Sequence, residues 1–283
     1  MKKLVIVLLS AAILLLLFGT LVNSQLNEAS DPNNRPPLSS RPQVNPPQEE
    51  EPEELFEPRI GLYTGQGYWS EGIEAIKNFL DAYGIPYGEF DEQEASHADL
   101  SKSFDAVWFA GGFSEEYRHY ISSHDNIRAY VENGGVFIGT CAGAYYAADT
   151  MLWGENRLDY PLKLFAGQAV GPHLSWGEHA ALTLNPDLPV NAGFRKTIGV
   201  RYFDGPYFVV SDTQEVIVLA EYASNKAPAV LALEYGSGKV LLMGPHPELG
   251  YDPATSIIDT AGGGGAQWPW LYGVLQWLIT PSS

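Results

Sequence analysis

The sequence predicts an α/β fold in which a mostly parallel sheet is flanked by helices and continues into an added β-rich C-terminal half. Two observations predict this fold. Between residue 58 and about residue 164, short apolar runs alternate with helix-compatible stretches, which favours parallel strands joined by right-handed crossovers. Beyond residue 164, strand-like runs follow one another closely and a Trp-rich helix ends the sequence.

The elements of the first half follow from apolar runs and the residues that punctuate them. Amphipathic patterns predict a helix over 71–83 and a helical stretch that ends near Val131, where Asn133 and Gly134 close it. A further helix-compatible run covers 144–148. Four apolar runs predict strands over 59–64, 85–91, 104–109 and 135–140.

The second half is expected to consist mainly of strands. Gly236, Ser237 and Gly238 separate the last two of them, which favours a hairpin. The closing helix over 267–279 carries several tryptophans, which we expect to pack it onto the sheet. The strand-like runs cover 164–170, 180–184, 197–203, 207–210, 215–222, 229–235 and 239–243.

Residues 1–24 predict an N-terminal membrane anchor or signal peptide. Lys2 and Lys3 precede an almost unbroken apolar run over 4–22. At a helical rise of 1.5 Å per residue such a run spans roughly 28 Å, close to the thickness of a bilayer core. We favour a retained helical anchor, with secretion after cleavage before Gln25 as the alternative. Both place the rest of the chain outside the cytoplasmic membrane, because the lysines stay inside.

Composition divides the remainder into a linker and a folded domain. Residues 25–57 are rich in Pro and Glu and predict a disordered linker, because they cannot bury enough apolar surface to offset their ordering entropy. The α/β domain is expected over 58–283. The formal net charge of −18 repels phosphate backbones, so nucleic-acid binding is not expected. Membrane contact is expected only through the N-terminal segment. For a protein partner the sequence makes no prediction.

Cys141, the only cysteine of the sequence, is the candidate nucleophile. It lies in the segment GTCAG (139–143), between a predicted strand and a helix-compatible run. A G-x-nucleophile-x-G turn strains the central residue and exposes its side chain at the carboxyl edge of the sheet. The N-terminus of the following helix favours the thiolate. The alternative is a buried, inert cysteine that acts as a small hydrophobe.

His246 is the candidate general base. It follows the last predicted strand in the segment GPHPE (244–248), where two prolines stiffen the turn. The spacing allows Glu248 to bind one ring nitrogen of His246 and leaves the other nitrogen for Cys141. The alternative is a surface turn in which both side chains are solvated.

Three residues are candidates for binding an oxyanion through their backbone N–H groups. Gly111 and Gly112 follow the predicted strand over 104–109 and carry no side chain that would obstruct a ligand. Ala142 follows the nucleophile and would supply the partner N–H group. A zinc site built on His173 and His179 is not expected, because no second ligand pair has metal-site spacing.

Several of these segments together resemble a known family. FAGG (109–112), GTCAGAYYA (139–147) and GPHPE (244–248) are similar to class I glutamine amidotransferase-like domains and, more closely, to the biotin–protein ligase N-terminal domain family. YFDGP (202–206) and the run over 227–248 are also similar to that family. The resemblance covers about residues 59–248 and implies a flavodoxin-like, class I glutamine amidotransferase-like fold.

The resemblance also implies a Cys–His–Glu triad. Cys141 would be the nucleophile, His246 the general base and acid, and Glu248 the residue that orients the imidazole. Gly111, Gly112 and Ala142 would surround the oxyanion. One departure from the family is Ala110, which stands where a proline usually precedes the double glycine.

These observations predict an extracytoplasmic, cysteine-dependent amide hydrolase or glutaminase-like protein that acts on a small-molecule amide. No metal and no cofactor are expected. The resemblance does not extend to a ligase domain, so biotin transfer is not expected. The alternative function is a non-catalytic, amidotransferase-like binding or scaffold domain tethered to the membrane. A proteolytic or deglycase-like activity is a further alternative.

Overall fold

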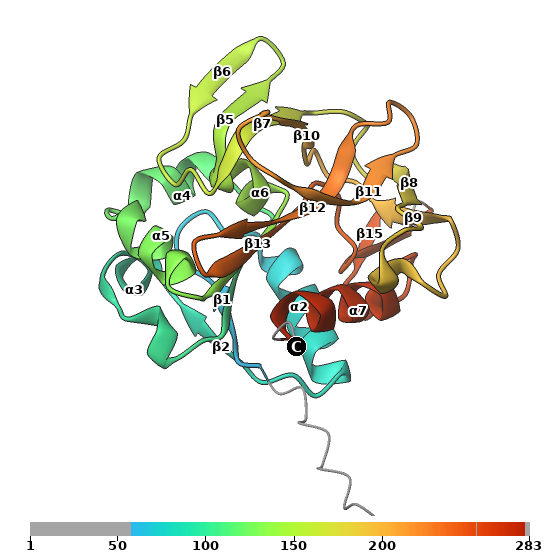
Figure 1. Ribbon diagram of the computed structural model, residues 1–283. Coiled ribbons are helices and arrows are strands. Elements are labelled where there is room, and N and C mark those ends of the chain that lie inside the picture. The colour runs from blue at the N-terminus through green and yellow to red at the C-terminus, as the bar shows by residue number, and fades with distance from the viewer. Residues whose placement is uncertain (1–57, 253, 281–283) are drawn as a thin grey trace, which may run out of the picture. The chain divides into compact units, whose positions relative to one another are not determined.

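A nine-stranded sheet is the centre of the computed structural model, which describes residues 58–252 and 254–280 (Figure 1). The chain divides into two compact units, residues 1–54 and 55–283, and everything described belongs to the second. The expected anchor over 1–24 and linker over 25–57 lie outside the described residues. Within 58–252 and 254–280, no helix is both long and apolar enough to cross a membrane.

The sheet has a parallel half and an antiparallel half, in the strand order β2-β1-β3-β4-β13-β12-β11-β8-β9. Neighbours from β2 to β13 pair in parallel, and neighbours from β13 to β9 pair antiparallel. The parallel strands are β1 (Ile60–Tyr63), β2 (Tyr87–Phe90), β3 (Ala106–Phe109), β4 (Val136–Thr140) and β13 (Gly238–Met243). The antiparallel ones are β12 (Pro228–Tyr235), β11 (Ile217–Tyr222), β8 (His179–Leu184) and β9 (Thr197–Arg201).

Helices cover both faces of the parallel half because successive side chains of its strands are buried on opposite faces. Leu62 and Trp108 pack toward one face, against α2 (Ser70–Ala82) and α7 (Trp268–Ile279). Tyr63 and Val107 pack toward the other face. That face is covered by α3 (Glu92–His97), α4 (Ser114–Tyr120), α5 (His124–Glu132) and α6 (Ala142–Ala147).

Helix α2 illustrates how the local sequence sets the boundaries of an element. Its buried face consists of apolar residues at helical spacing, among them Ile73, Ile76 and Leu80. The helix ends where Gly84 adopts a φ of 65° and the Ile85 N–H donates to the Leu80 carbonyl, which is a Schellman C-cap.

Smaller elements surround the main sheet. A second, four-stranded sheet has the order β10-β7-β5-β6, and Figure 1 shows its β5–β6 hairpin projecting from the rest. Its strands are β5 (Ala148–Trp153), β6 (Asn156–Asp159), β7 (Phe165–Gly171) and β10 (Tyr207–Val210). A short hairpin pairs β14 (Gly250–Asp252) with β15 (Ile257–Asp259), and η2 (Leu100–Lys102) and η3 (Pro189–Asn191) are single 3₁₀ turns.

The structure confirms the predicted fold class and corrects several elements. The helical stretch expected to end near Val131 is two helices, α4 and α5, and between them the Ser122 N–H donates to the side chain of Ser96. The helix expected over 144–148 begins at Ala142, and Ala148 already belongs to β5. Helix α3 is an additional element, and its capping box is visible in the sequence at 91–94.

We predict that Gly143→Ala destabilises the fold. A Cβ on Gly143 would lie 2.0 Å from the Phe109 carbonyl oxygen, which is backbone and cannot move aside cheaply. The free energy of unfolding in urea should fall by about 3 kcal/mol. Gly273→Ala is the control, because nothing lies within 4 Å of its added Cβ, and it should be neutral or stabilising by up to about 1 kcal/mol. Equal stability of the two variants would contradict the close packing of α6 on β3.

Candidate active site

A strained turn holds Cys141 between β4 and α6. Cys141 has φ 50° and ψ −102°, which a residue with a side chain adopts only at a cost. The flanking glycines make this turn possible. A Cβ on Gly139 would lie 2.7 Å from Gly143 backbone atoms, and Gly143 in turn contacts Phe109. Both glycines of the predicted motif are therefore required by packing, as is typical of a nucleophile turn.

The end of β13 brings His246 to the same edge of the sheet. Met243 pairs with Thr140 in the parallel register of β13 and β4. The Cys141 N–H donates to the Met243 carbonyl at 2.8 Å, and the His246 N–H donates to the Arg201 carbonyl at 2.8 Å. These bonds fix the backbone on both sides of the gap between Cys141 and His246.

His246 and Glu248 form a fully buried hydrogen-bonded pair. His246 Nδ1 lies 2.6 Å from Glu248 Oε1, and both side chains have zero exposure. This contact is the one that the spacing of GPHPE predicts. The alternative of a solvated surface turn is therefore wrong. Among the described residues, His246 Nε2 and Glu248 Oε2 have no hydrogen-bond partner.

The electrostatics of the pair favour the imidazolium. Burial lowers the pKa of His246, but the Glu248 charge, the nearby Cys141 and the hydrogen bond with Glu248 outweigh it and raise that pKa to about 10. The raised pKa favours the protonated ring, and Cys141 is near enough to contribute to the shift.

Two aromatic rings and a glycine enclose the imidazole. The centroids of Trp69 and Phe203 lie 5.6 and 5.5 Å from that of His246, both in edge-on geometry. On a third side, a Cβ on Gly111 would lie 2.7 Å from His246 Cε1, so a side chain at position 111 would displace the ring. These contacts fix the orientation of the imidazole that the hydrogen bond to Glu248 selects.

The three residues predicted around the oxyanion lie in two segments of the chain. Gly111 and Gly112 follow β3, and their turn is tied to a neighbouring loop because the Gly111 carbonyl accepts from the Trp69 N–H at 3.0 Å. Gly112 has φ 150°, and a Cβ there would lie 2.1 Å from the Gly67 carbonyl oxygen. Ala142 is the first residue of α6, so its N–H has no intrahelical partner.

A segment that the sequence analysis did not anticipate covers the thiol. We call residues 203–206 the strap. The Cys141 thiol donates to the Phe203 carbonyl at 3.4 Å, the Tyr145 hydroxyl to the Asp204 carbonyl at 2.9 Å, and the Tyr222 hydroxyl to the Pro206 carbonyl at 3.0 Å. The expectation of an exposed thiol is therefore wrong, because Cys141 is only 7% exposed beneath this strap.

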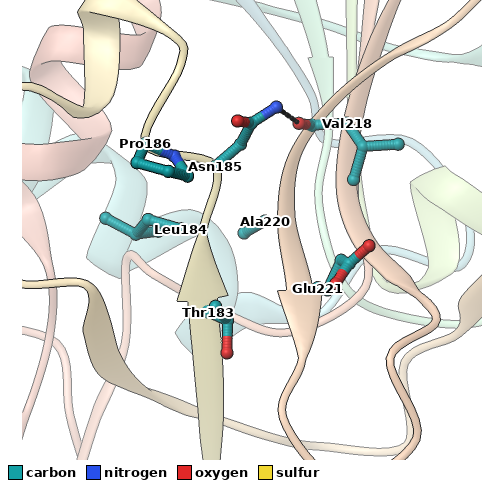
Figure 2. Close-up of a pocket in the computed structure, with 7 residues that line it drawn as sticks. All are labelled: Thr183, Leu184, Asn185, Pro186, Val218, Ala220 and Glu221. Carbon is teal, nitrogen blue, oxygen red and sulfur yellow. Dashed lines mark hydrogen bonds between the residues drawn. The ribbon is translucent and has the colours of Figure 1, made fainter.

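A separate pocket of about 270 Å³ opens elsewhere on the sheet, between β8 and β11 (Figure 2). None of the predicted site residues lines it. Asn185 spans its edge, where its Nδ2 donates to the Val218 carbonyl at 3.1 Å (Figure 2). The lining residues are Thr183, Leu184, Asn185, Pro186, Val218, Ala220 and Glu221.

Comparisons with known proteins point to one family and one fold. The family model for the N-terminal domain of biotin-protein ligase matches residues 62–260. An uncharacterized protein from Chlamydia muridarum is 27% identical over 214 residues, which cover 67% of this chain and 80% of that protein. Two solved glutamine amidotransferases share the fold. One has a TM-score of 0.54 at 19% identity over 78% of this chain and 98% of its own. The other, from Thermotoga maritima, has a TM-score of 0.56 at 12% identity over 79% and 98%.

We predict that Glu248→Gln lowers the pKa of His246 from about 10, because the glutamine still accepts the Nδ1 hydrogen bond but removes the carboxylate charge. The NMR shift of the His246 Cε1 proton as a function of pH measures this. Glu234→Gln, an exposed change on β12, is the control and should leave the titration unchanged. An identical titration in wild type and Glu248→Gln would contradict the assignment.

The raised pKa of His246 also predicts that the stability of the fold depends on pH. The folded His246 binds its proton more tightly than the unfolded residue, whose pKa is about 6.5. Its contribution to the free energy of unfolding is therefore complete below about pH 6.5 and is lost as the pH rises toward 10. Urea unfolding at several pH values should show wild type losing more stability over this window than Glu248→Gln.

Proposed function

Since the chain belongs to the family of biotin–protein ligase N-terminal domains and has the fold of glutamine amidotransferases, we propose that it is a cysteine-dependent amide hydrolase that uses Cys141, His246 and Glu248. The carrying observation is the buried pair of His246 and Glu248 at the same sheet edge as the strained turn of Cys141.

The chemistry follows from these groups. His246 takes the thiol proton of Cys141 at Nε2, the thiolate attacks the carbonyl carbon of the amide, and the oxyanion that forms accepts hydrogen bonds from backbone N–H groups at Gly111, Gly112 and Ala142. His246 donates its Nε2 proton to the leaving amine, so the C–N bond breaks and a thioester remains. Neutral His246 then takes a proton from water, which hydrolyses the thioester to the acid and returns the thiolate. Glu248 orients the imidazole throughout.

The strap has to give way for this chemistry. The nucleophile is only 7% exposed and its thiol proton is engaged by the Phe203 carbonyl. Ionisation of Cys141 removes that donor and leaves two electron-rich atoms, Sγ and the carbonyl oxygen, facing each other. Loss of this bond therefore favours displacement of the strap when the thiolate forms.

The same burial supports a second candidate function, a non-catalytic binding domain with an amidotransferase-like fold. In such a domain Cys141 serves as a donor that pins the strap, and the buried pair of His246 and Glu248 stabilises one packing arrangement. The two functions differ in the reactivity that they require of the thiol.

We predict that Cys141→Ala abolishes amide hydrolysis. Glutamine and other small primary carboxamides, together with peptide and glycated substrates, are assayed for release of ammonia or amine by the intact chain. The rate should fall by at least about 10³-fold in Cys141→Ala, and His246→Ala should fall comparably, because the residues of a triad act as a unit. Tyr235→Phe on β12 serves as a control and should retain the wild-type rate.

Two results would support the binding domain instead. One is the absence of any hydrolysis in wild type above the rate measured for Cys141→Ala. The other is alkylation of Cys141 by iodoacetamide at neutral pH that is no faster than that of free cysteine and is unaffected by His246→Ala.

We further propose that residues 1–24 anchor the domain outside the cytoplasmic membrane, on the basis of the lysines and the apolar run over 4–22. The full chain should remain in the membrane fraction after a carbonate wash, and protease added to spheroplasts should digest it. A variant without residues 2–24 should be found in the soluble cytosolic fraction. Protection of the full chain from external protease would reject this orientation.

A further inference from the structure

A chain of aromatic rings leads from the candidate imidazole to the surface. Trp69 and Phe203 contact His246, and the ring of Trp176 lies 6.2 Å from Trp69 and 4.9 Å from Phe203. Trp176 is 58% exposed although it is a large apolar side chain. We call Trp69, Trp176 and Phe203 the aromatic mouth.

Two more exposed aromatic residues adjoin the turn that carries Gly112. Tyr68 forms a β-bridge with Gly112 and is 40% exposed, and Phe113 is the next residue and is 69% exposed. The Phe113 N–H donates to the Gly67 carbonyl at 2.8 Å, which holds the two loops together. Exposed apolar side chains that gather beside a buried reactive group are typical of a ligand site.

Several carboxylates lie close to these rings in the sequence. Glu71 and Glu178 each follow a tryptophan of the mouth by two residues, and Asp204 follows Phe203 directly. Glu116 lies against the Tyr68 loop, since its Cβ is 2.7 Å from the position of a Cβ on Gly67. None of these four carboxylates forms an ion pair with a described cation. Burial raises the pKa of Asp204, as expected of a carboxylate without a counter-charge.

The neighbouring cation forms no ion pair with them. The Arg201 guanidinium lies 5.5 Å above the ring of Tyr251 and donates to the carbonyl oxygens of Gly177, Tyr251 and Gly264. These contacts occupy its donors on the backbone beside the mouth. The mouth therefore combines π faces with carboxylates that have no cation of their own.

Faces of tryptophan and carboxylates without a counter-cation are two groups that bind organic cations. We propose that the site takes amide substrates that carry an ammonium, quaternary ammonium or guanidinium group close to the scissile carbonyl, held at the aromatic mouth. The inference rests on the proposed function, because it assigns a substrate class to the same cysteine. His246 Nε2, fully buried and without a partner among the described residues, is the polar atom left for the amide end.

The single cysteine allows a direct test with three methanethiosulfonate reagents, which carry a trimethylammonioethyl, a methyl or a sulfonatoethyl group. In each reaction the Cys141 thiolate attacks the reagent's sulfenyl sulfur, a disulfide forms and methanesulfinate leaves. Intact mass measures the rate, which is divided by the rate with free cysteine. The normalised preference for the cationic over the neutral reagent should reach about tenfold in wild type, and the anionic reagent should be slowest.

Two variants separate the two kinds of contact. Trp176→Leu removes a π face, and Glu178→Gln removes a charge but keeps the acceptor of the Ser175 N–H. Each should lower the cationic preference several-fold, and added salt should weaken the effect of Glu178 more than that of Trp176. Phe194→Leu is the matched control, because Phe194 is 36% exposed but is not part of the mouth, and it should keep the wild-type preference.

The outcomes are distinguishable. A normalised preference near one, or one that survives both Trp176→Leu and Glu178→Gln, overturns the cationic substrate class and leaves the hydrolase proposal standing. If even the small neutral reagent labels Cys141 only after denaturation, the hydrolase proposal fails, and the inference fails with it.

Discussion

The candidate active site depends on the contact between the turn at Cys141 and the ends of the strands beside it. Gly143 lies against the Phe109 carbonyl at the end of β3, and the Cys141 N–H donates to the Met243 carbonyl at the end of β13. Three neighbouring strands thus deliver three different groups to one edge of the sheet: the double glycine, the thiol and the imidazole. A side chain at position 143 would push these three groups apart. The close approach of one backbone segment to another is therefore the main constraint on the site, rather than any contact between side chains.

The surroundings of the imidazole determine its orientation and its pKa. Trp69, Phe203 and Gly111 enclose the ring, and the charge of Glu248 together with the nearby Cys141 raises its pKa. The Trp268 side chain also donates to the Glu248 carbonyl at 2.9 Å, so α7 is attached to the same turn. The closing helix, whose tryptophans the sequence predicts to pack on the sheet, therefore also supports the site.

What could be predicted from the sequence was local. The turn over 139–143, the spacing of His246 and Glu248, and most strands follow from glycine placement and apolar runs that are visible within about ten residues. The strap over 203–206 and the mouth around Trp176 could not be predicted in this way. They depend on tertiary contacts between residues far apart, such as that of Cys141 with Phe203, and no periodicity marks such contacts.

The pairing of β4 with β13 has a kinetic consequence. These strands are neighbours in the sheet, yet Val136 and its partner Lys239 are separated by roughly 100 residues of chain. Closing so long a loop costs chain entropy before any contact between the strands can offset that cost. Topologies of this kind therefore fold slowly. The thiol emerges during synthesis well before the imidazole does, so a partly made chain carries the sulfur without the imidazole. Cys141 and His246 reach the same edge only once the whole sheet has closed.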